Sequence, residues 1–156
     1  MSVYIHWDRT FETGQPLIDA EHRLLVLLFK KIDVAIKTNQ SDSTLARIIV
    51  EVRKCVEFHF ASEENVMSET RYPGFVAHRD AHFELTTELG LMVSRLALHR
   101  EYPDDFLSFV SRWLTDHISH HDQALARYVR DAVSRPVAEL SYSEYLLSPA
   151  PDALPT

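Results

Sequence analysis

Seven side chains that can bind a metal ion are spread along the 156-residue chain. Five are histidines and two are carboxylates: His22, His59, Glu63, His78, His82, His117 and Asp122. This mixture suits a borderline first-row metal such as iron. If each carboxylate bridges two irons, the five histidines divide as three and two. With one oxo or hydroxo bridge, one iron has six ligands and the other five, which leaves a position for a small molecule such as O2.

Two pairs of these residues have a spacing of four. His59 and Glu63 form one pair, and His78 and His82 form the other. Residues four apart lie on one face of a helix, so each pair can reach a single metal site. Taken alone, either pair could equally belong to a solvated surface, and the pattern gains weight only when the helices are placed.

His117 and Asp122 are five apart. In an ideal α-helix this spacing puts Asp122 about one turn further along and rotated from the face of His117. Such a position suits a carboxylate that reaches between two metal ions. An exposed acid would be the simpler interpretation of Asp122 by itself.

Four long helices are needed to carry these residues. The chain has only three glycines, and apolar residues recur at helical spacing. Asp19 is a suitable cap for the first helix, and Pro103 suits the first turn of the last. After an extended segment over residues 1–17, the expected helices are residues 19–38, 43–69, 75–100 and 103–134.

Short connections between long helices predict an all-α, up-down-up-down four-helix bundle. We expect one domain over residues 1–135 and a C-terminal extension over residues 136–156. That extension contains a short helix over about residues 137–147, followed by a flexible proline-rich tail. In this topology, the starts of the first and third helices meet the ends of the second and fourth, so all seven candidate ligands converge on one level.

Composition excludes several other classes of function. The net charge of −7 argues against a nucleic-acid partner and against an anionic membrane surface. No apolar stretch approaches the roughly 20 residues that span a bilayer. Cys55 is the only cysteine, so no internal disulfide can form, and we expect it to be a buried small hydrophobe. The N-terminus has no signal-peptide pattern, so we expect a cytoplasmic protein. We also expect it to be a monomer.

Two other residues, Trp113 and His120, could lie near the site. Trp113 precedes His117 by four, and we expect it to be a core residue that also walls an O2 pocket. His120 follows His117 by three and could approach the same pocket. The default expectation for His6, His99 and His121 is the surface.

The chain resembles the bacterial hemerythrins at four places. The matching motifs are Trp7…Gly14…Ile18-Asp19-Ala20-Glu21-His22, His59-Phe60-Ala61-Ser62-Glu63-Glu64, His78-Arg79-Asp80-Ala81-His82 and Trp113…His117-Ile118-Ser119-His120-His121-Asp122. The sequence departs from the family at Glu21, where Gln is frequent, at Leu125, where Tyr is common, and at His120, where a less polar residue is expected. These departures concern the surroundings of the ligands and not the ligands themselves.

The resemblance implies a role for each ligand. His78, His82 and His117 would bind the six-coordinate iron, and His22 and His59 the iron with the open position. Glu63 and Asp122 would bridge the two irons, together with the oxo or hydroxo group. O2 would bind end-on at the open iron and be held as hydroperoxide. NO or small anions could use the same position.

The leading function is therefore a non-enzymatic oxygen carrier, store or delivery protein. A second hypothesis is a sensor domain for O2, NO or redox state, in which the proline-rich tail is a linker to an output domain. A third is a di-iron oxidase or peroxidase, although such enzymes in ferritin-like bundles use more carboxylates. A plain helical bundle without metal would bury several unpaired histidines and acids, which is costly.

Overall fold

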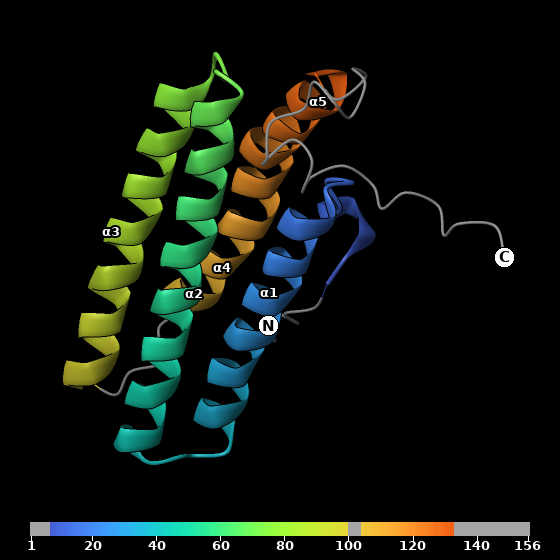
Figure 1. Cartoon of the computed structure of the whole chain (residues 1–156). Coiled ribbons are helices and arrows are strands. Elements are labelled where there is room, and N and C mark those ends of the chain that lie inside the picture. The colour runs from blue at the N-terminus through green and yellow to red at the C-terminus, as the bar shows by residue number, and fades with distance from the viewer. Residues whose placement is uncertain (1–6, 100–103, 133–156) are drawn as a thin grey trace, which may run out of the picture.

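The computed structural model describes residues 7–99 and 104–132, and all regular structure within these ranges is helical. The elements are η1 (Arg9–Phe11), α1 (Pro16–Lys37), α2 (Asp42–Glu69), α3 (Phe75–His99), α4 (Asp104–Arg112), η2 (Trp113–Asp122) and α5 (Gln123–Ala132). The last three follow one another without a gap and form the fourth rod of the bundle (Figure 1). Neighbouring rods alternate in direction, which confirms the predicted four-helix bundle.

The N-terminal segment differs from the expectation. Its described part contains a 3-10 turn, η1 (Arg9–Phe11), and α1 begins at Pro16, three residues before the predicted cap. Asp19 instead lies buried in the first turn of α1. Its Oδ1 accepts hydrogen bonds from the backbone N–H of Thr13 at 2.7 Å and from the Thr13 hydroxyl at 2.8 Å, and its Oδ2 accepts one from the N–H of Gly14 at 3.1 Å. Asp19 therefore fixes the segment that enters the helix.

The connections between the rods are short, and specific residues explain where the helices begin and end. Ser41 caps α2 by accepting a hydrogen bond from the N–H of Thr44 at 3.2 Å. Asn39, after α1, and Arg71, after α2, have positive φ angles of 52° and 53°, which reverse the chain at the helix ends. These turns hold α1, α2 and α3 as antiparallel neighbours.

The fourth rod was predicted to be a single α-helix, and this prediction is wrong. Its central ten residues, η2 (Trp113–Asp122), form a π-helix between α4 and α5. A π-helix has i→i+5 hydrogen bonds, and here the N–H of Gln123 bonds to the carbonyl of Ile118. Residues five apart then lie on nearly the same face. The rotation expected between His117 and Asp122 for an ideal α-helix is therefore largely removed.

Two apolar clusters lie along the bundle axis. The larger includes Leu25, Phe29, Ile32, Val52, Trp113 and Ile118. The smaller contains Ile18, Val66, Met67, Leu125 and Val129. Along α1, α2 and the fourth rod, the candidate ligands stand between residues of the two clusters, for example His22 between Ile18 and Leu25. The polar layer is thus shielded by apolar residues above and below.

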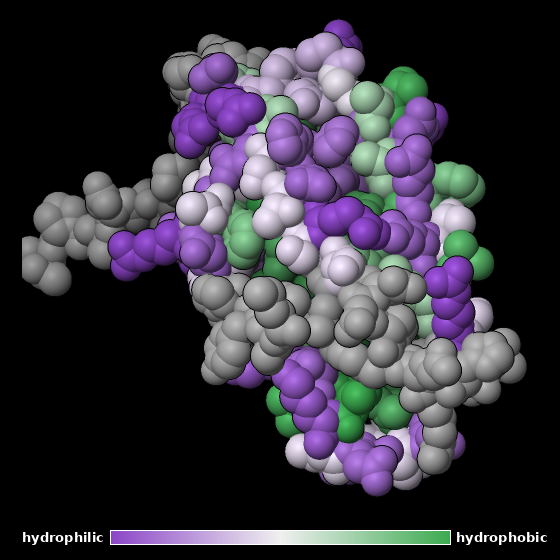
Figure 2. Space-filling model, turned by 180° about the vertical axis from the view of Figure 1, so that it is seen from behind, coloured by the Kyte–Doolittle hydropathy of each residue, from purple (hydrophilic) through white to green (hydrophobic). Residues whose placement is uncertain are grey.

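The described surface is mostly hydrophilic on the face shown in Figure 2. Within residues 7–99 and 104–132, no helix has an apolar stretch long enough to cross a membrane. The predictions for the extension over residues 136–156, and for His6 and the side chain of His99, lie outside the described residues.

Candidate metal centre

The structure gathers the seven candidate ligands into two overlapping groups. One contains Glu63, His78, His82, His117 and Asp122, and the other contains His22, His59, Glu63 and Asp122. Within each group, one donor atom from every residue lies within 4.8 Å of those from all the others. The groups share only the two carboxylates, and they separate the histidines as three and two. This is the division that the donor count predicts.

All four rods contribute to the cluster. His22 comes from α1, and His59 and Glu63 from α2, while His78 and His82 come from α3 and His117 and Asp122 from η2. The pairs on α2 and α3 share a face because they are four apart. The pair on η2 shares a face because the helix there has the wider π-turn. All seven side chains are buried, with at most 4% of any residue exposed.

Asp122 faces both groups with different oxygen atoms. Its Oδ1 lies 3.0 Å from Nε2 of His78 and 3.1 Å from Nε2 of His117. Its Oδ2 lies 3.0 Å from Nε2 of His22. One oxygen is thus turned to the three-histidine group and the other to the two-histidine group, as a bridging carboxylate requires.

Glu63 occupies the other shared position. Its Oε2 lies 3.1 Å from Nε2 of His82, 3.4 Å from Nε2 of His78 and 3.6 Å from Nε2 of His59. Its Oε1 is buried and has no hydrogen-bond partner among the described residues. Glu63 therefore also contacts histidines of both groups and has an oxygen to spare.

The hydrogen bonding of the cluster is incomplete in the described part of the chain. Buried atoms without a partner there include Nε2 of His22, His59 and His117, and Oδ2 of Asp122. Nε2 of His22 and Oδ2 of Asp122 are only 3.0 Å apart, yet they are not aligned as donor and acceptor. Buried polar atoms normally have partners, and leaving them without one is costly. The donor set therefore fits a pair of metal ions that would satisfy these atoms.

The electrostatics of the donor set favour positive charge. Burial raises the pKa of Asp122, but the charge of His117 and the close approach of the histidine nitrogens, including the hydrogen bond from His78, hold it well below its usual range. The histidines likewise lower the pKa of Glu63 against the effects of burial and of Asp122. For His78, burial lowers the pKa, but hydrogen bonds to Asp122 and Glu63 raise it to about 9. A bound cation would take the place of such protons.

Two further carboxylates hold histidine rings from outside the cluster. Oε2 of Glu21 lies 2.8 Å from Nδ1 of His59, and Oε1 of Glu64 lies 3.0 Å from Nδ1 of His82. A carboxylate behind a metal-binding histidine fixes the ring and raises its basicity. The family resemblance had placed Glu21 in the surroundings of the ligands, but the sequence predicted neither of these two pairings. The only signal was that each acid stands beside a candidate ligand in the sequence, whereas its partner lies on another helix.

Trp113 borders the two-histidine group. Its ring centroid lies 6.1 Å from the rings of His22 and His59, at interplanar angles of 87° and 89°. Phe29 packs behind it, with the ring centroids 5.4 Å apart. Trp113 is only 2% exposed, so an apolar wall stands beside the group with fewer donors.

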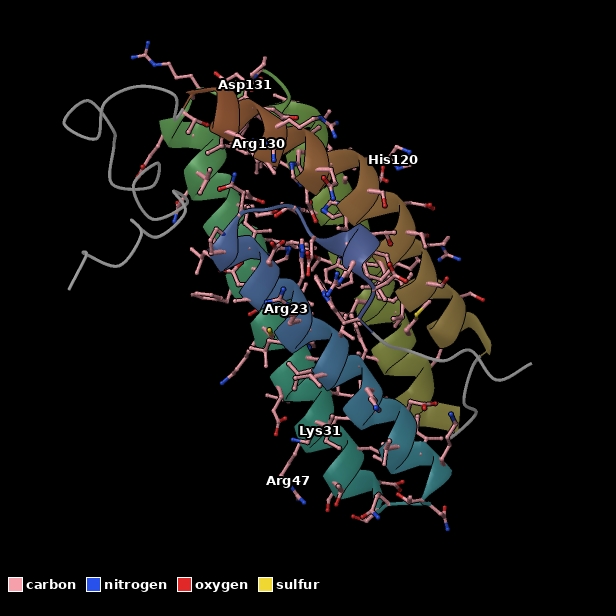
Figure 3. All side chains as sticks on the ribbon, turned by 90° about the vertical axis from the view of Figure 1, so that its right-hand side faces the viewer. Arg23, Lys31, Arg47, His120, Arg130 and Asp131 are labelled. Atoms are coloured by element: carbon pink, nitrogen blue, oxygen red, sulfur yellow. The ribbon has the colours of Figure 1, made fainter. Side chains whose placement is uncertain are left out.

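His120 and His121 lie differently from what was expected. Contrary to its assignment to the O2 pocket, His120 is exposed, and Figure 3 shows it on the outside of its helix. Its Nδ1 is 2.8 Å from the carbonyl oxygen of Asp116. His121 was expected at the surface but is half-buried, with its ring 5.1 Å from that of His117 and 5.2 Å from that of His78. His121 is thus a further neighbour of the cluster that the sequence did not predict.

Comparisons with known proteins agree with this geometry. Residues 13–129 match the family described as the Hemerythrin HHE cation binding domain. The chain is 30% identical to a bacteriohemerythrin of Stenotrophomonas maltophilia over 124 residues, which is 80% of each chain. It is 25% identical to a bacteriohemerythrin of Pseudomonas aeruginosa over 92% of this chain and 94% of that one. It is also 28% identical to a myohemerythrin of Riftia pachyptila over 78% of this chain and 89% of the relative.

Proposed function

The chain belongs to the hemerythrin family, and from this premise we propose that it binds O2 reversibly at a centre of two iron ions. His78, His82 and His117 would hold one iron, and His22 and His59 the other. Glu63 and Asp122 would bridge them, together with an oxo or hydroxo group. The observation that carries the proposal is that the two groups of donors share only these two carboxylates.

The protein side chains account for reversible binding in two ways. The two-histidine group has fewer donors, so its iron keeps a position for a small molecule. Trp113, backed by Phe29, presents an apolar ring there, which would keep bulk water from the bound oxygen. The finer expectation, that O2 binds end-on and is held as hydroperoxide, belongs to this proposal, as does the use of the same position by NO or small anions.

We further propose that the protein is not an enzyme. Five of the seven donors are histidines, and the site has few of the carboxylates that di-iron oxygen-activating bundles use. The cytoplasmic location and the monomeric state remain predictions from the sequence.

The test is a visible absorption spectrum of the dithionite-reduced protein before and after exposure to air, together with an iron assay. We expect two irons per chain and an absorption band that appears in air and disappears under argon. Irreversible conversion to the ferric form would contradict oxygen carriage. Absence of iron after anaerobic reconstitution would contradict the site itself.

A matched pair of variants separates the cluster from the other histidines. His78→Ala removes a buried donor and should lose iron. His120→Ala removes an exposed histidine of the same rod as His117 and should keep both irons and the reversible band. Equal iron loss in the two variants would contradict the assignment.

A further inference from the structure

A pocket of about 510 Å³ opens between α2 and α3. Its walls include Glu57, Phe60, Glu64, Asp80, His82 and Phe83. The volume lies within the roughly 300–1,000 Å³ typical of sites for small organic molecules. The proposed oxygen site does not use this pocket, because the two-histidine group lies beside Trp113.

His82 connects the pocket to the metal cluster. Its Nε2 lies 3.1 Å from Oε2 of Glu63 within the cluster. Its Nδ1 lies 3.0 Å from Oε1 of Glu64, whose side chain is 34% exposed. The ring of Phe60 stacks on that of His82 with centroids 3.9 Å apart and an interplanar angle of 9°. A single imidazole therefore belongs to the three-histidine group and also lines the pocket.

The charges in the pocket select for a cation. Glu57, Glu64 and Asp80 supply three carboxylates and Arg79 one guanidinium, a net charge of −2 (1 − 3). Arg79 lies 3.8 Å from Asp80 and also stands over the ring of Phe75 at 5.5 Å, so it offsets only part of the negative charge.

Phe83 adds an aromatic surface to this negative pocket. It is 73% exposed, so its ring is available to a ligand. An aromatic face attracts cations, most strongly when the contact excludes water. The pocket thus combines negative charge with an exposed ring, which suits a flat cationic molecule.

We propose that the α2–α3 pocket binds an aromatic cationic one-electron donor, and that electrons pass through His82 to reduce the oxidised centre. This proposal rests on the proposed function. Two donor molecules would each lose one electron, and the two ferric ions that the site would hold would each take up one and become ferrous. With a viologen radical cation as donor, the product is the viologen dication, and no covalent bond forms or breaks.

The first experiment measures binding and does not depend on iron chemistry. Equilibrium dialysis of the protein as isolated against the methyl viologen dication gives its affinity. The double variant Glu57→Gln/Asp80→Asn should weaken binding about tenfold. Two negative charges that concentrate the dication in the pocket are removed in it. Glu51→Gln, which removes an α2 carboxylate paired with Lys31 outside the pocket, is the control and should bind normally. Equal binding by all three proteins would overturn the pocket assignment, whether or not the protein holds iron.

The second experiment follows reduction of the ferric protein by stopped-flow absorption. Ala61 is exposed and lines the pocket, so Ala61→Trp should fill it without touching the cluster. We expect reduction by the viologen radical cation to slow by about the same factor as binding weakens, and reduction by the dithionite anion to change little. If the variant binds viologen less well but is reduced at the wild-type rate, the electron route through His82 is wrong.

Discussion

The Nδ1 atom of His59 lies 2.8 Å from Oε2 of Glu21, and both side chains are buried. This hydrogen bond joins α1 to α2 behind the two-histidine group. It leaves Nε2 of His59 directed to the cluster. A buried carboxylate at this place makes the imidazole a stronger donor and favours the ferric state of a bound iron.

Glu21→Gln should weaken this support while keeping the shape of the side chain. We expect iron affinity to fall only slightly in Glu21→Gln, because the amide oxygen can still accept a hydrogen bond from Nδ1 of His59. Glu21→Ala should lower it by about 10-fold to 100-fold, the usual effect of removing an outer partner of a metal ligand. The midpoint potential should rise, because a negative charge near the iron is lost. Competition with a chelator and redox titration measure the two effects. Glu12→Gln, at an exposed acid paired with Arg23, should change neither quantity.

Asp122→Ala should release iron from both groups, because its two oxygens face different histidines. The iron assay should fall well below two per chain, and Asp122→Asn should show a similar loss with less change of packing. Circular dichroism checks that the helices remain. Two irons retained in either variant would refute the bridging role of Asp122.

Trp113→Phe should shorten the lifetime of the oxygenated protein, because the smaller ring opens the apolar wall beside His22 and His59. The decay of the oxygenated band in air measures this lifetime. Trp7→Phe is the control, since Trp7 packs on Phe11 and not on the ligand rings. Trp113→Ala should also lower the free energy of unfolding by about 3–5 kcal/mol. A wild-type lifetime in both Trp113 variants would rule out the wall.

The metal-free protein should lose stability between pH 6.5 and 9. The pKa of His78 is raised from 6.5 to about 9, so its contribution is complete below pH 6.5 and disappears as the pH rises through 9. The lowered pKa values of Glu63 and Asp122 have the opposite sign, and their contribution is lost only in acid. Urea unfolding of the metal-free protein as a function of pH measures the trend.

His78→Gln should reduce this pH dependence, because one of the two cluster histidines with a raised pKa is absent. His59, whose pKa is also raised by Glu63 and Glu21 against the effect of burial, would keep part of it. A metal-free protein that becomes more stable from pH 7 to 9 would contradict the assignment.

The sequence predicted the bundle and the convergence of the seven side chains because both follow from simple periodicities. His78 and His82 share a face in any α-helix, and short connections determine which helix ends meet. The π-helix at Trp113–Asp122 was not predicted, since its hydrogen bonds depend on packing around the whole rod. The five-residue spacing of His117 and Asp122 was the one feature of the sequence that was consistent with a π-helix.

The partners of the ligand rings were harder to predict. Glu64 bonds to His82, which lies 18 positions further along on another helix. The rotation of α2 about its axis relative to α3 decides such a contact. The spacing of residues in one sequence does not predict that rotation. The π-helix likewise decides which residues of the fourth rod face the cluster. His121 was therefore placed at the surface and His120 near the pocket, although the two are adjacent in the sequence.

The wide separation of the ligands along the chain bears on how the protein assembles. His22 and Asp122 are 100 positions apart (122 − 22), and the residues between them supply all the other donors. Closing a loop of this length lowers the entropy of an open chain, and a bridging metal holds it closed in the manner of a covalent crosslink. Since each of the four rods supplies at least one donor, two irons would be retained only once the fourth rod has docked. Iron content would then report on completed folding, and the undocking of any single rod would release the ions.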